Sequence, residues 1–117
     1  MGEERAWEPE NELVARYWSP RYSINAVIEM QKVVDWVQST KLESHNIPLA
    51  TLYMKDDPTI NHDAAIAFHE AWRSNLKKLI KVTIDPENVQ HVFTGKISAP
   101  HRVDWTVRNC LDFLRSV

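Results

Sequence analysis

The sequence predicts an α/β protein, in which helices and strands alternate along one chain. Two apolar stretches of strand length, residues 49–54 and 77–85, are each followed by a polar turn. Stretches with the apolar spacing of helices precede, separate and follow them, at residues 24–40, 62–74 and 101–116. Short connections between alternating elements favour right-handed crossovers, so we expect two parallel strands packed with three helices.

The composition is that of a globular protein without an obvious nucleic-acid or membrane partner. The chain has 117 residues, of which 44% are hydrophobic, enough for one domain with a modest core. A formal net charge of −2 and scattered basic residues predict no nucleic-acid partner. No apolar run approaches the roughly 18 residues that would span a membrane. The single cysteine, Cys110, fits a reducing compartment, so we expect a cytoplasmic protein, and no motif indicates a cofactor.

The first 22 residues are predicted to form an extended segment with one short helix. Residues 1–11 are polar, and Glu12–Tyr17 fits a helix that Pro20 would end. Four aromatic side chains gather in this region, namely Trp7, Tyr17, Trp18 and Tyr22. Such a cluster either covers the edge of a core or forms the wall of a substrate pocket or an interface anchor.

Ser23 is a suitable N-cap for the helix expected at residues 24–40. Its apolar side chains follow steps of three and four residues and form a broad face that includes Val27, Met30, Val34 and Val37. We interpret this helix as a packing element that carries no chemistry.

An acidic turn follows the first predicted strand. Leu49–Met54 is apolar and uncharged, and the chain then turns abruptly polar at Asp56 and Asp57. Asn61 is suited to cap a helix that begins near His62. Open α/β sheets place functional residues after the C-terminal ends of their strands, which makes this turn a candidate site. A solvated Asp-Asp turn without a function is the alternative interpretation.

The helix expected at residues 62–74 carries two histidines. We expect its packing face to hold Ala64, Ala65, Phe68, Ala71 and Trp72. A metal site formed by His62, His69 and Asp63 is disfavoured, because zinc-binding histidines on one helix usually lie four residues apart and no further ligand is evident. We interpret both histidines as solvated residues of the polar face.

Residues 77–85 are predicted to form an edge strand, since Ile80 and Val82 alternate with Lys81 and Thr83. His91 lies in the connection that follows. Gly95, also in that connection, permits a backbone angle that other residues avoid.

The final helix, residues 101–116, is predicted to bury one apolar stripe. This stripe consists of Val103, Val107, Cys110, Leu111 and Leu114, with charged residues on the other side. Cys110 is therefore expected to be an inert core residue.

Three segments, taken in order, resemble the C-terminal part of a known superfamily. Residues 49–60, LATLYMKDDPTI, end an apolar strand in an acidic turn; residues 90–114, QHVFTGKISAPHRVDWTVRNCLDFL, place a histidine loop before the last helix. They are similar to the acid turn, histidine loop and final helix of the alpha/beta-hydrolase superfamily. Asp57 stands at the acid of its G-x-x-D-x-x-V pattern, Met54 replaces the usual glycine, and His91 stands at the catalytic histidine. SPRYSINAVIEMQKVVDWVQ resembles the helix that returns from the cap in bacterial esterases and lipases.

The resemblance implies a partial alpha/beta-hydrolase fold. Residues 1–22 would be an extended or cap-derived segment, and residues 23–117 the C-terminal part of the hydrolase domain. The two strands would be equivalent to the last two of the sheet. In a Ser-His-acid triad the histidine takes the nucleophile's proton and the carboxylate orients the imidazole, and this superfamily supplies the three in the order Ser, acid, His. The resemblance thus assigns catalytic roles to Asp57 and His91, with Asp56 as the second candidate for the acid.

The nucleophile of such a triad is missing from this sequence. A Gly-x-Ser-x-Gly turn is impossible because Gly2 and Gly95 are the only glycines. We therefore interpret the chain as the C-terminal fragment of a serine hydrolase that acts on a carboxylic ester or similar acyl substrate, inactive by itself.

Two alternatives remain open at this point. The chain is either a non-catalytic interaction module of α/β type or an independent small α/β protein whose Asp and His match by chance. In the hydrolase interpretation, the partners are the small acyl or ester substrate of the parent enzyme and either the missing N-terminal part or a second copy of the chain. A second polypeptide is expected because one edge of strand 49–54 has no neighbour.

Overall fold

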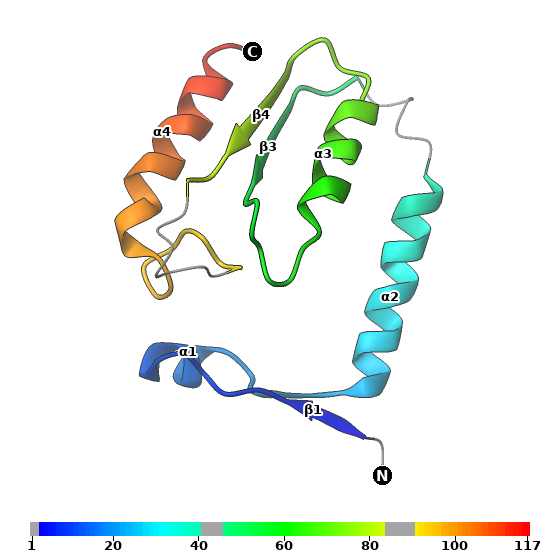
Figure 1. Cartoon of the computed structure of the whole chain (residues 1–117), viewed down its shortest axis with the longest axis vertical. Helices are drawn as coiled ribbons and strands as arrows, with labels where there is room; N and C mark the ends of the chain where they lie inside the picture. Colours follow the sequence, from blue (N-terminus) through cyan, green and yellow to red (C-terminus); the bar gives the residue numbers. More distant parts are fainter. Residues whose placement is uncertain (1–2, 41–45, 84–90) are drawn as a thin grey trace. The chain divides into compact units, whose positions relative to one another are not determined.

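The computed structural model describes residues 3–40, 46–83 and 91–117. The chain forms two compact units, Met1–Lys41 and Leu42–Val117, whose elements are labelled in Figure 1. Helices and a parallel two-stranded sheet occur together, which confirms the predicted α/β class. The helix at residues 24–39 belongs to the first unit, whereas the resemblance grouped it with the sheet in residues 23–117; that hydrolase-like division stays a prediction. In the described residues no helix is long and apolar enough to cross a membrane.

In the first unit, two short strands form a ribbon that the sequence did not reveal. β1 (Glu4–Ala6) pairs antiparallel with β2 (Arg21–Ser23), with Glu4 opposite Ser23. All six of these residues are exposed. A strand of three exposed residues has no alternation of buried and solvated side chains, so nothing in residues 4–6 distinguished a strand from an extended terminus.

The helix α1 (Glu12–Tyr17) has the predicted bounds and is capped by Asn11. The Asn11 side-chain oxygen accepts hydrogen bonds from the backbone N–H groups of Leu13 and Val14, at 3.0 and 2.9 Å. Of the predicted aromatic cluster, Trp7 is half-buried and its indole N–H donates to the carbonyl of Ser19 at 3.2 Å. The other three aromatic side chains, Tyr17, Trp18 and Tyr22, are exposed.

The helix α2 (Ile24–Ser39) begins as predicted, since the Ser23 hydroxyl accepts a hydrogen bond from the N–H of Ala26 at 3.3 Å. Within its own unit the broad apolar face of α2 is not covered, since none of its residues is buried, and its role as a packing element stays a prediction. Met30 and Trp36 are 60% and 69% exposed. Within its own unit α2 lies beside the short strand β2, which is too small to cover a face of four helical turns.

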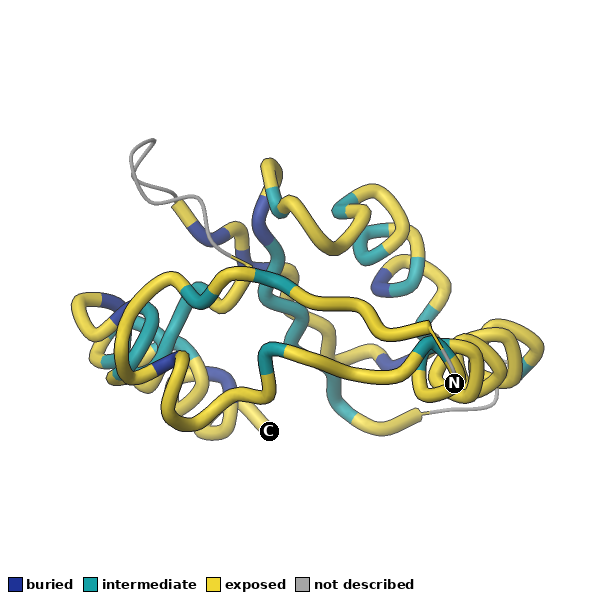
Figure 2. Tube along the Cα trace, turned by 90° about the horizontal axis from the view of Figure 1, so that it is seen from below, coloured by how far each residue is buried: buried dark blue, intermediate teal, exposed yellow. Residues whose placement is uncertain are grey.

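The second unit is built on a strand–helix–strand unit. β3 (Leu49–Tyr53), α3 (His62–Ala71) and β4 (Lys77–Lys81) follow one another, and the two strands are parallel, as predicted. Their register places Leu49 opposite Lys77 and Tyr53 opposite Lys81. In Figures 1 and 2, α3 and α4 (Val103–Leu114) lie on opposite sides of the strand pair.

The core of this unit lies where the strands end. Met54, Ile80 and Val82 are 2%, 7% and 1% exposed, and Phe113 of α4 is also buried. Lys81 and Thr83 are exposed, which confirms the alternation expected of an edge strand as far as residue 83; Ile84 and Asp85 lie outside the described residues. Figure 2 shows how few of the described residues are buried.

Contacts at the C-terminal end of α3 explain why this helix stops at Ala71 rather than at residue 74. The ammonium group of Lys77 donates to the carbonyl oxygens of His69 and Glu70 at 3.0 and 2.9 Å. A cation that binds the last carbonyls of a helix also interacts favourably with the helix dipole. The indole N–H of Trp72 donates to the carbonyl of Ile47 at 2.8 Å and turns the chain back toward β4.

The helix α4 does not bury the stripe that the sequence predicted. It follows a 3₁₀ turn, Pro100–Arg102, and packs through Arg102 and Phe113, with Trp105, Thr106 and Asn109 half-buried between them. The predicted stripe is open to solvent: only Val103 is half-buried, and Val107, Cys110, Leu111 and Leu114 are all exposed. Cys110 is therefore not a core residue.

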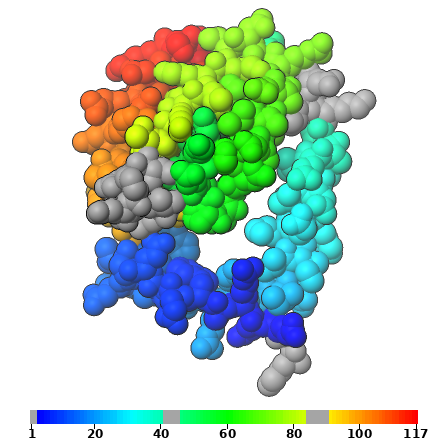
Figure 3. All heavy atoms as spheres, in the orientation of Figure 1, coloured from blue at the N-terminus to red at the C-terminus, as the bar shows by residue number. Residues whose placement is uncertain are grey.

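The two faces of α4 are neighbours around the helix axis, which is why the more apolar one was mistaken for the packed one. In Figure 3 the atoms of α4, orange to red, adjoin those of β4, in yellow-green. The described residues of its unit leave the apolar stripe uncovered.

Candidate functional site

Asp57 and His91 are in direct contact. His91 Nδ1 lies 3.1 Å from Asp57 Oδ1 and 3.0 Å from Oδ2. The sequence predicted this contact, because both residues follow neighbouring parallel strands. The side chain of Asp57 is only 10% exposed, whereas that of His91 is 46% exposed. The carboxylate is thus enclosed behind an imidazole that solvent can reach.

The turn after β3 holds the carboxylate in place. Met54 is buried at the end of the strand and anchors the backbone before the turn. Asp57 Oδ1 accepts hydrogen bonds from the backbone N–H groups of Thr59 and Ile60, at 2.8 and 2.9 Å. Asp side chains often stabilise turns in this way. Asn61 then caps α3, as predicted, by accepting from the N–H of Asp63 at 2.9 Å.

The hydrogen bonds to Asp57 also set its electrostatics. Partial burial alone would raise the pKa of this carboxyl. The hydrogen bond from His91, together with those from the backbone N–H groups of Ile60 and Thr59, outweighs burial and lowers the pKa below its usual value. Asp57 is therefore ionised throughout the neutral range and can serve as a hydrogen-bond acceptor for the imidazole.

His91 approaches Asp57 through Nδ1, which leaves Nε2 for another group. Among the described residues, no hydroxyl, thiol or carbonyl is hydrogen-bonded to Nε2.

The chain after His91 turns at Gly95, whose φ of 121° is one that residues with a side chain rarely adopt. The N–H of Ala99 donates to the Gly95 carbonyl at 2.9 Å and closes this loop.

A cavity of about 120 Å³ adjoins the pair. Its polar wall consists of Asp57, His91 and His62, and its apolar wall includes Met54, Ile60 and Phe93. The sequence interpretation missed His62, which it treated as a solvated residue of the polar face. Its position at the first residue of α3, directly after the acidic turn, was the available signal. His62 Nε2 lies 3.3 Å from the exposed carboxylate of Asp63.

Asp56, the second candidate for the acid, does not contact His91. It is exposed and lines a separate hollow together with Lys55 and Lys81. Side chains of successive residues on a turn project in different directions, and here Asp57 alone of the two meets the histidine.

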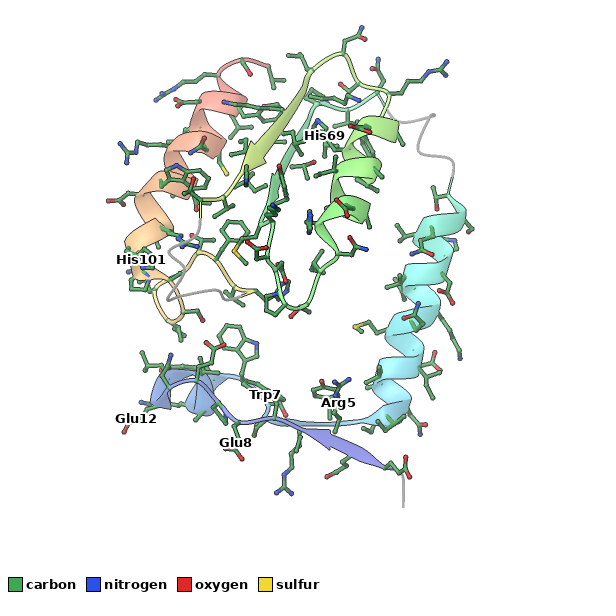
Figure 4. The ribbon with its side chains drawn as sticks, viewed as in Figure 1. Arg5, Trp7, Glu8, Glu12, His69 and His101 are labelled. Carbon is green, nitrogen blue, oxygen red and sulfur yellow. The ribbon has the colours of Figure 1, made fainter. Side chains whose placement is uncertain are left out.

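His69 is buried, at 7% exposure, so its interpretation as a solvated residue is wrong. Its Nδ1 lies 3.0 Å from the hydroxyl oxygen of Thr51, and Figure 4 shows it on the side of α3 that faces the strands. Burial lowers the pKa of His69, and the positive charge of Lys77 lowers it further against a smaller opposite effect of Glu70. The hydroxyl of Thr51 supplies a partner that a buried, neutral imidazole needs, which apolar spacing along the helix could not reveal.

The described residues contain no group of three or more His, Cys, Asp or Glu side chains that could hold a metal ion. What the Asp57–His91 pair can do chemically is transfer a proton. A carboxylate at Nδ1 favours the tautomer whose Nε2 is unprotonated, and that nitrogen can accept a proton from a hydroxyl or a water.

Comparison of the chain with protein-family models, curated proteins and solved structures gives no match.

Proposed function

We propose that this chain carries the acid and the histidine of a Ser-His-acid hydrolase that acts on a carboxylic ester or a similar acyl substrate. The observation that supports the proposal is the contact of His91 Nδ1 with both carboxylate oxygens of Asp57, at 3.0 and 3.1 Å. The two residues occur in the chain order, acid before histidine, that the alpha/beta-hydrolase superfamily uses. Parallel strands β3 and β4 precede them, as the last two strands of that sheet would.

In this proposal the two residues act on a nucleophile supplied by another polypeptide segment. His91 Nε2 takes the proton of a serine hydroxyl as its oxygen attacks the acyl carbon, and later gives that proton to the leaving group. Asp57 holds the imidazole in the required tautomer and stabilises the imidazolium that forms. The segment that supplies the serine and the oxyanion-binding N–H groups would be the missing N-terminal part of the hydrolase.

A test begins with the coding region upstream of residue 1. We expect an in-frame strand, a Gly-x-Ser-x-Gly turn and a helix. The protein that joins this segment to residues 1–117 should hydrolyse an activated ester. Substitution of Asp57→Asn should lower its kcat by about 10⁴-fold, as loss of the orienting carboxylate does in serine proteases.

Asp56→Asn is the matched control, since it removes the neighbouring carboxylate that does not contact His91. Equal losses of kcat in D56N and D57N would contradict the assignment of the acid. An upstream region without a nucleophile turn would contradict the proposal as a whole.

An interaction module is the second candidate function, and the exposed apolar stripe of α4 favours it. Val107, Leu111 and Leu114 are 49%, 43% and 65% exposed on one helix. An apolar stripe that is open to solvent is typical of a surface that contacts another polypeptide. Its partner would be the missing N-terminal part or a second copy of the chain.

The exposed free Cys110 fits a reducing compartment such as the cytoplasm.

A further inference from the structure

A second cavity, of about 240 Å³, opens between the end of β4 and the start of α4. It is lined by Val82, Thr83, His101, Arg102 and Trp105. None of these residues lines the cavity beside Asp57 and His91. Like that cavity, it lies where a strand of a parallel sheet ends, the place at which open α/β sheets bind ligands. Figure 4 shows His101 at the start of α4.

Arg102 is the feature of this cavity that requires an explanation. The residue is only 8% exposed. Within the described residues its guanidinium has no hydrogen-bond or ion-pair partner, whereas its backbone N–H donates to the carbonyl of Ala99 at 3.2 Å. A largely buried, permanently charged group without a protein partner is unfavourable, and an anion bound to it would offset that cost.

Arg102 lines this cavity, and its guanidinium nitrogens are not fully enclosed. Among the described residues, Thr106 Oγ1 is the one fully enclosed side-chain polar atom without a partner, so the nitrogens of Arg102 keep an opening. Arg102 also occupies the N-cap of α4, which has no side-chain cap. The positive end of the helix dipole adds to the attraction for an anion there. The acidic residue of this first turn, Asp104, is exposed and not paired with Arg102.

The remaining walls indicate the rest of the ligand. Val82 is 1% exposed and Trp105 is half-buried, so they offer an apolar surface and an aromatic ring. His101 and Thr83 are exposed at the rim. A planar guanidinium binds a carboxylate through two parallel N–H donors, and one buried cation matches one negative charge better than the two of a phosphate.

We propose that this cavity binds a small carboxylate whose apolar or aromatic body contacts Val82 and Trp105. The proposal does not rest on the Asp57–His91 pair. At 240 Å³ the cavity is below the usual size for drug-like ligands, which limits the ligand to about the size of benzoate.

The test uses the ¹⁵N-labelled full chain and benzoate as the probe. The indole N–H signal of Trp105 and the Nε–H signal of Arg102 are followed by NMR as benzoate is added. Both should shift and saturate at millimolar concentrations, whereas the indole signal of the exposed Trp36 should not move. Benzamide, which has the same shape without the charge, and inorganic phosphate should produce no saturating shift.

Arg102→Gln removes the proposed cation, and Arg108→Gln is the matched control. Arg108 is an exposed residue of the same helix whose Nε donates to the Asp104 carbonyl. R102Q should weaken benzoate binding at least about ten-fold, and R108Q should leave it within about two-fold of the unchanged chain. If R102Q fails to fold, the proposal is tested by comparing the binding of benzoate and benzamide to the unchanged chain.

Three results with the variants and probes above would overturn the proposal, and a fourth comes from a further control. The first three are the absence of a saturating benzoate shift, equal binding of benzamide, and an equal loss of affinity in R108Q. Asp85 and Glu87 lie outside the described residues and supply a further control. Benzoate binding that occurs only in the D85N/E87Q double variant would assign the guanidinium to an internal carboxylate and refute an external ligand.

Discussion

His91 Nδ1 and the carboxylate of Asp57 join two turns that lie 34 residues apart in the chain, at 3.0 and 3.1 Å. The same carboxylate accepts hydrogen bonds from the backbone N–H groups of Thr59 and Ile60. Asp57 therefore stabilises the turn after β3 and also connects this turn to His91. Its contribution to stability can be measured whether or not the pair takes part in catalysis.

Replacing Asp57 with alanine should destabilise the protein by about 1–3 kcal/mol, because the change removes an enclosed acceptor of three hydrogen bonds. Asp56→Ala, at an exposed position of the same turn, should cost no more than about 0.5 kcal/mol. Urea unfolding at pH 7, followed by circular dichroism, gives both values. Similar losses in the two variants would show that Asp57 does not hold the turn.

His69 should make stability depend on pH. The folded state lowers the pKa of His69 from 6.5, mainly through burial, so near and below this pH the unfolded chain binds more protons. Stability is then complete above about pH 6.5 and falls as the pH decreases through this value toward the lower pKa of the folded state. The free energy of unfolding, measured in urea from pH 8 to pH 5, should show this decline.

A His69→Gln variant retains an amide that can bond Thr51 but cannot titrate. Its stability should fall less between pH 8 and pH 5 than that of the unchanged chain. His101→Gln, at an exposed position, should preserve the full decline. If H69Q and the unchanged chain have the same pH dependence, another group is responsible.

The hydroxyl of Thr106 should destabilise the folded state, and a substitution can remove it. It is buried on α4 and has no hydrogen-bond partner among the described residues. Thr106→Val replaces the hydroxyl with a methyl group of similar size and should raise the free energy of unfolding by about 1 kcal/mol. Thr59→Val, at an exposed position, should change it by less than about 0.5 kcal/mol. A loss of stability in T106V would mean that the hydroxyl has a partner in solution.

The purified chain alone should not hydrolyse an activated ester faster than a His91→Gln variant or buffer. The pair can accept a proton, but no described hydroxyl or thiol is bonded to His91. A spectrophotometric assay with a nitrophenyl ester is sufficient. Steady turnover that a serine-directed phosphonate abolishes would reveal a nucleophile within the chain and contradict the fragment interpretation.

The chain should not persist as a monomer of 13.7 kDa. Within the described residues the sheet has two strands, and α4 exposes the apolar stripe of Val107, Leu111 and Leu114. Light scattering behind a sizing column at micromolar concentration should report a dimer or larger species. Leu114→Glu should shift it toward the monomer, while Arg115→Glu, at the next position, should do so less. A single monomeric peak with a cooperative melt would show that the unit covers its own core.

The elements with strong local signals were predictable from sequence. Leu49–Tyr53 is an uninterrupted apolar run, and Asn61 marks the start of α3 by a side chain that caps it. The contact between Asp57 and His91 followed from a general rule, because parallel strands bring their C-terminal ends to one edge of a sheet. Bounds were less accurate, and α3 ended three residues early where Lys77 and Trp72 turn the chain.

The errors arose where tertiary contacts outweigh hydrophobic patterning. His69 is buried although it was expected in solvent, because its imidazole contacts the hydroxyl of Thr51, which sequence spacing does not encode. Leu114 is exposed although its residue type suggested a core. Periodicity tells that a helix has an apolar side, but which side packs depends on the surface that the rest of the fold provides.

The backbone amides of β3 point alternately toward β4 and toward the opposite edge of the strand. The N–H of Leu49 donates to Leu76 at 3.0 Å and the carbonyl of Tyr53 accepts from Val82 at 2.8 Å, so alternate residues from 49 to 53 point toward β4. Ala50 and Leu52 consequently direct their N–H and C=O groups to the opposite edge. In hydrogen–deuterium exchange these two amides would lose protection before their neighbours do. An added strand would form hydrogen bonds with these same two residues. Slower exchange of their amides would therefore show that such a strand has paired with β3.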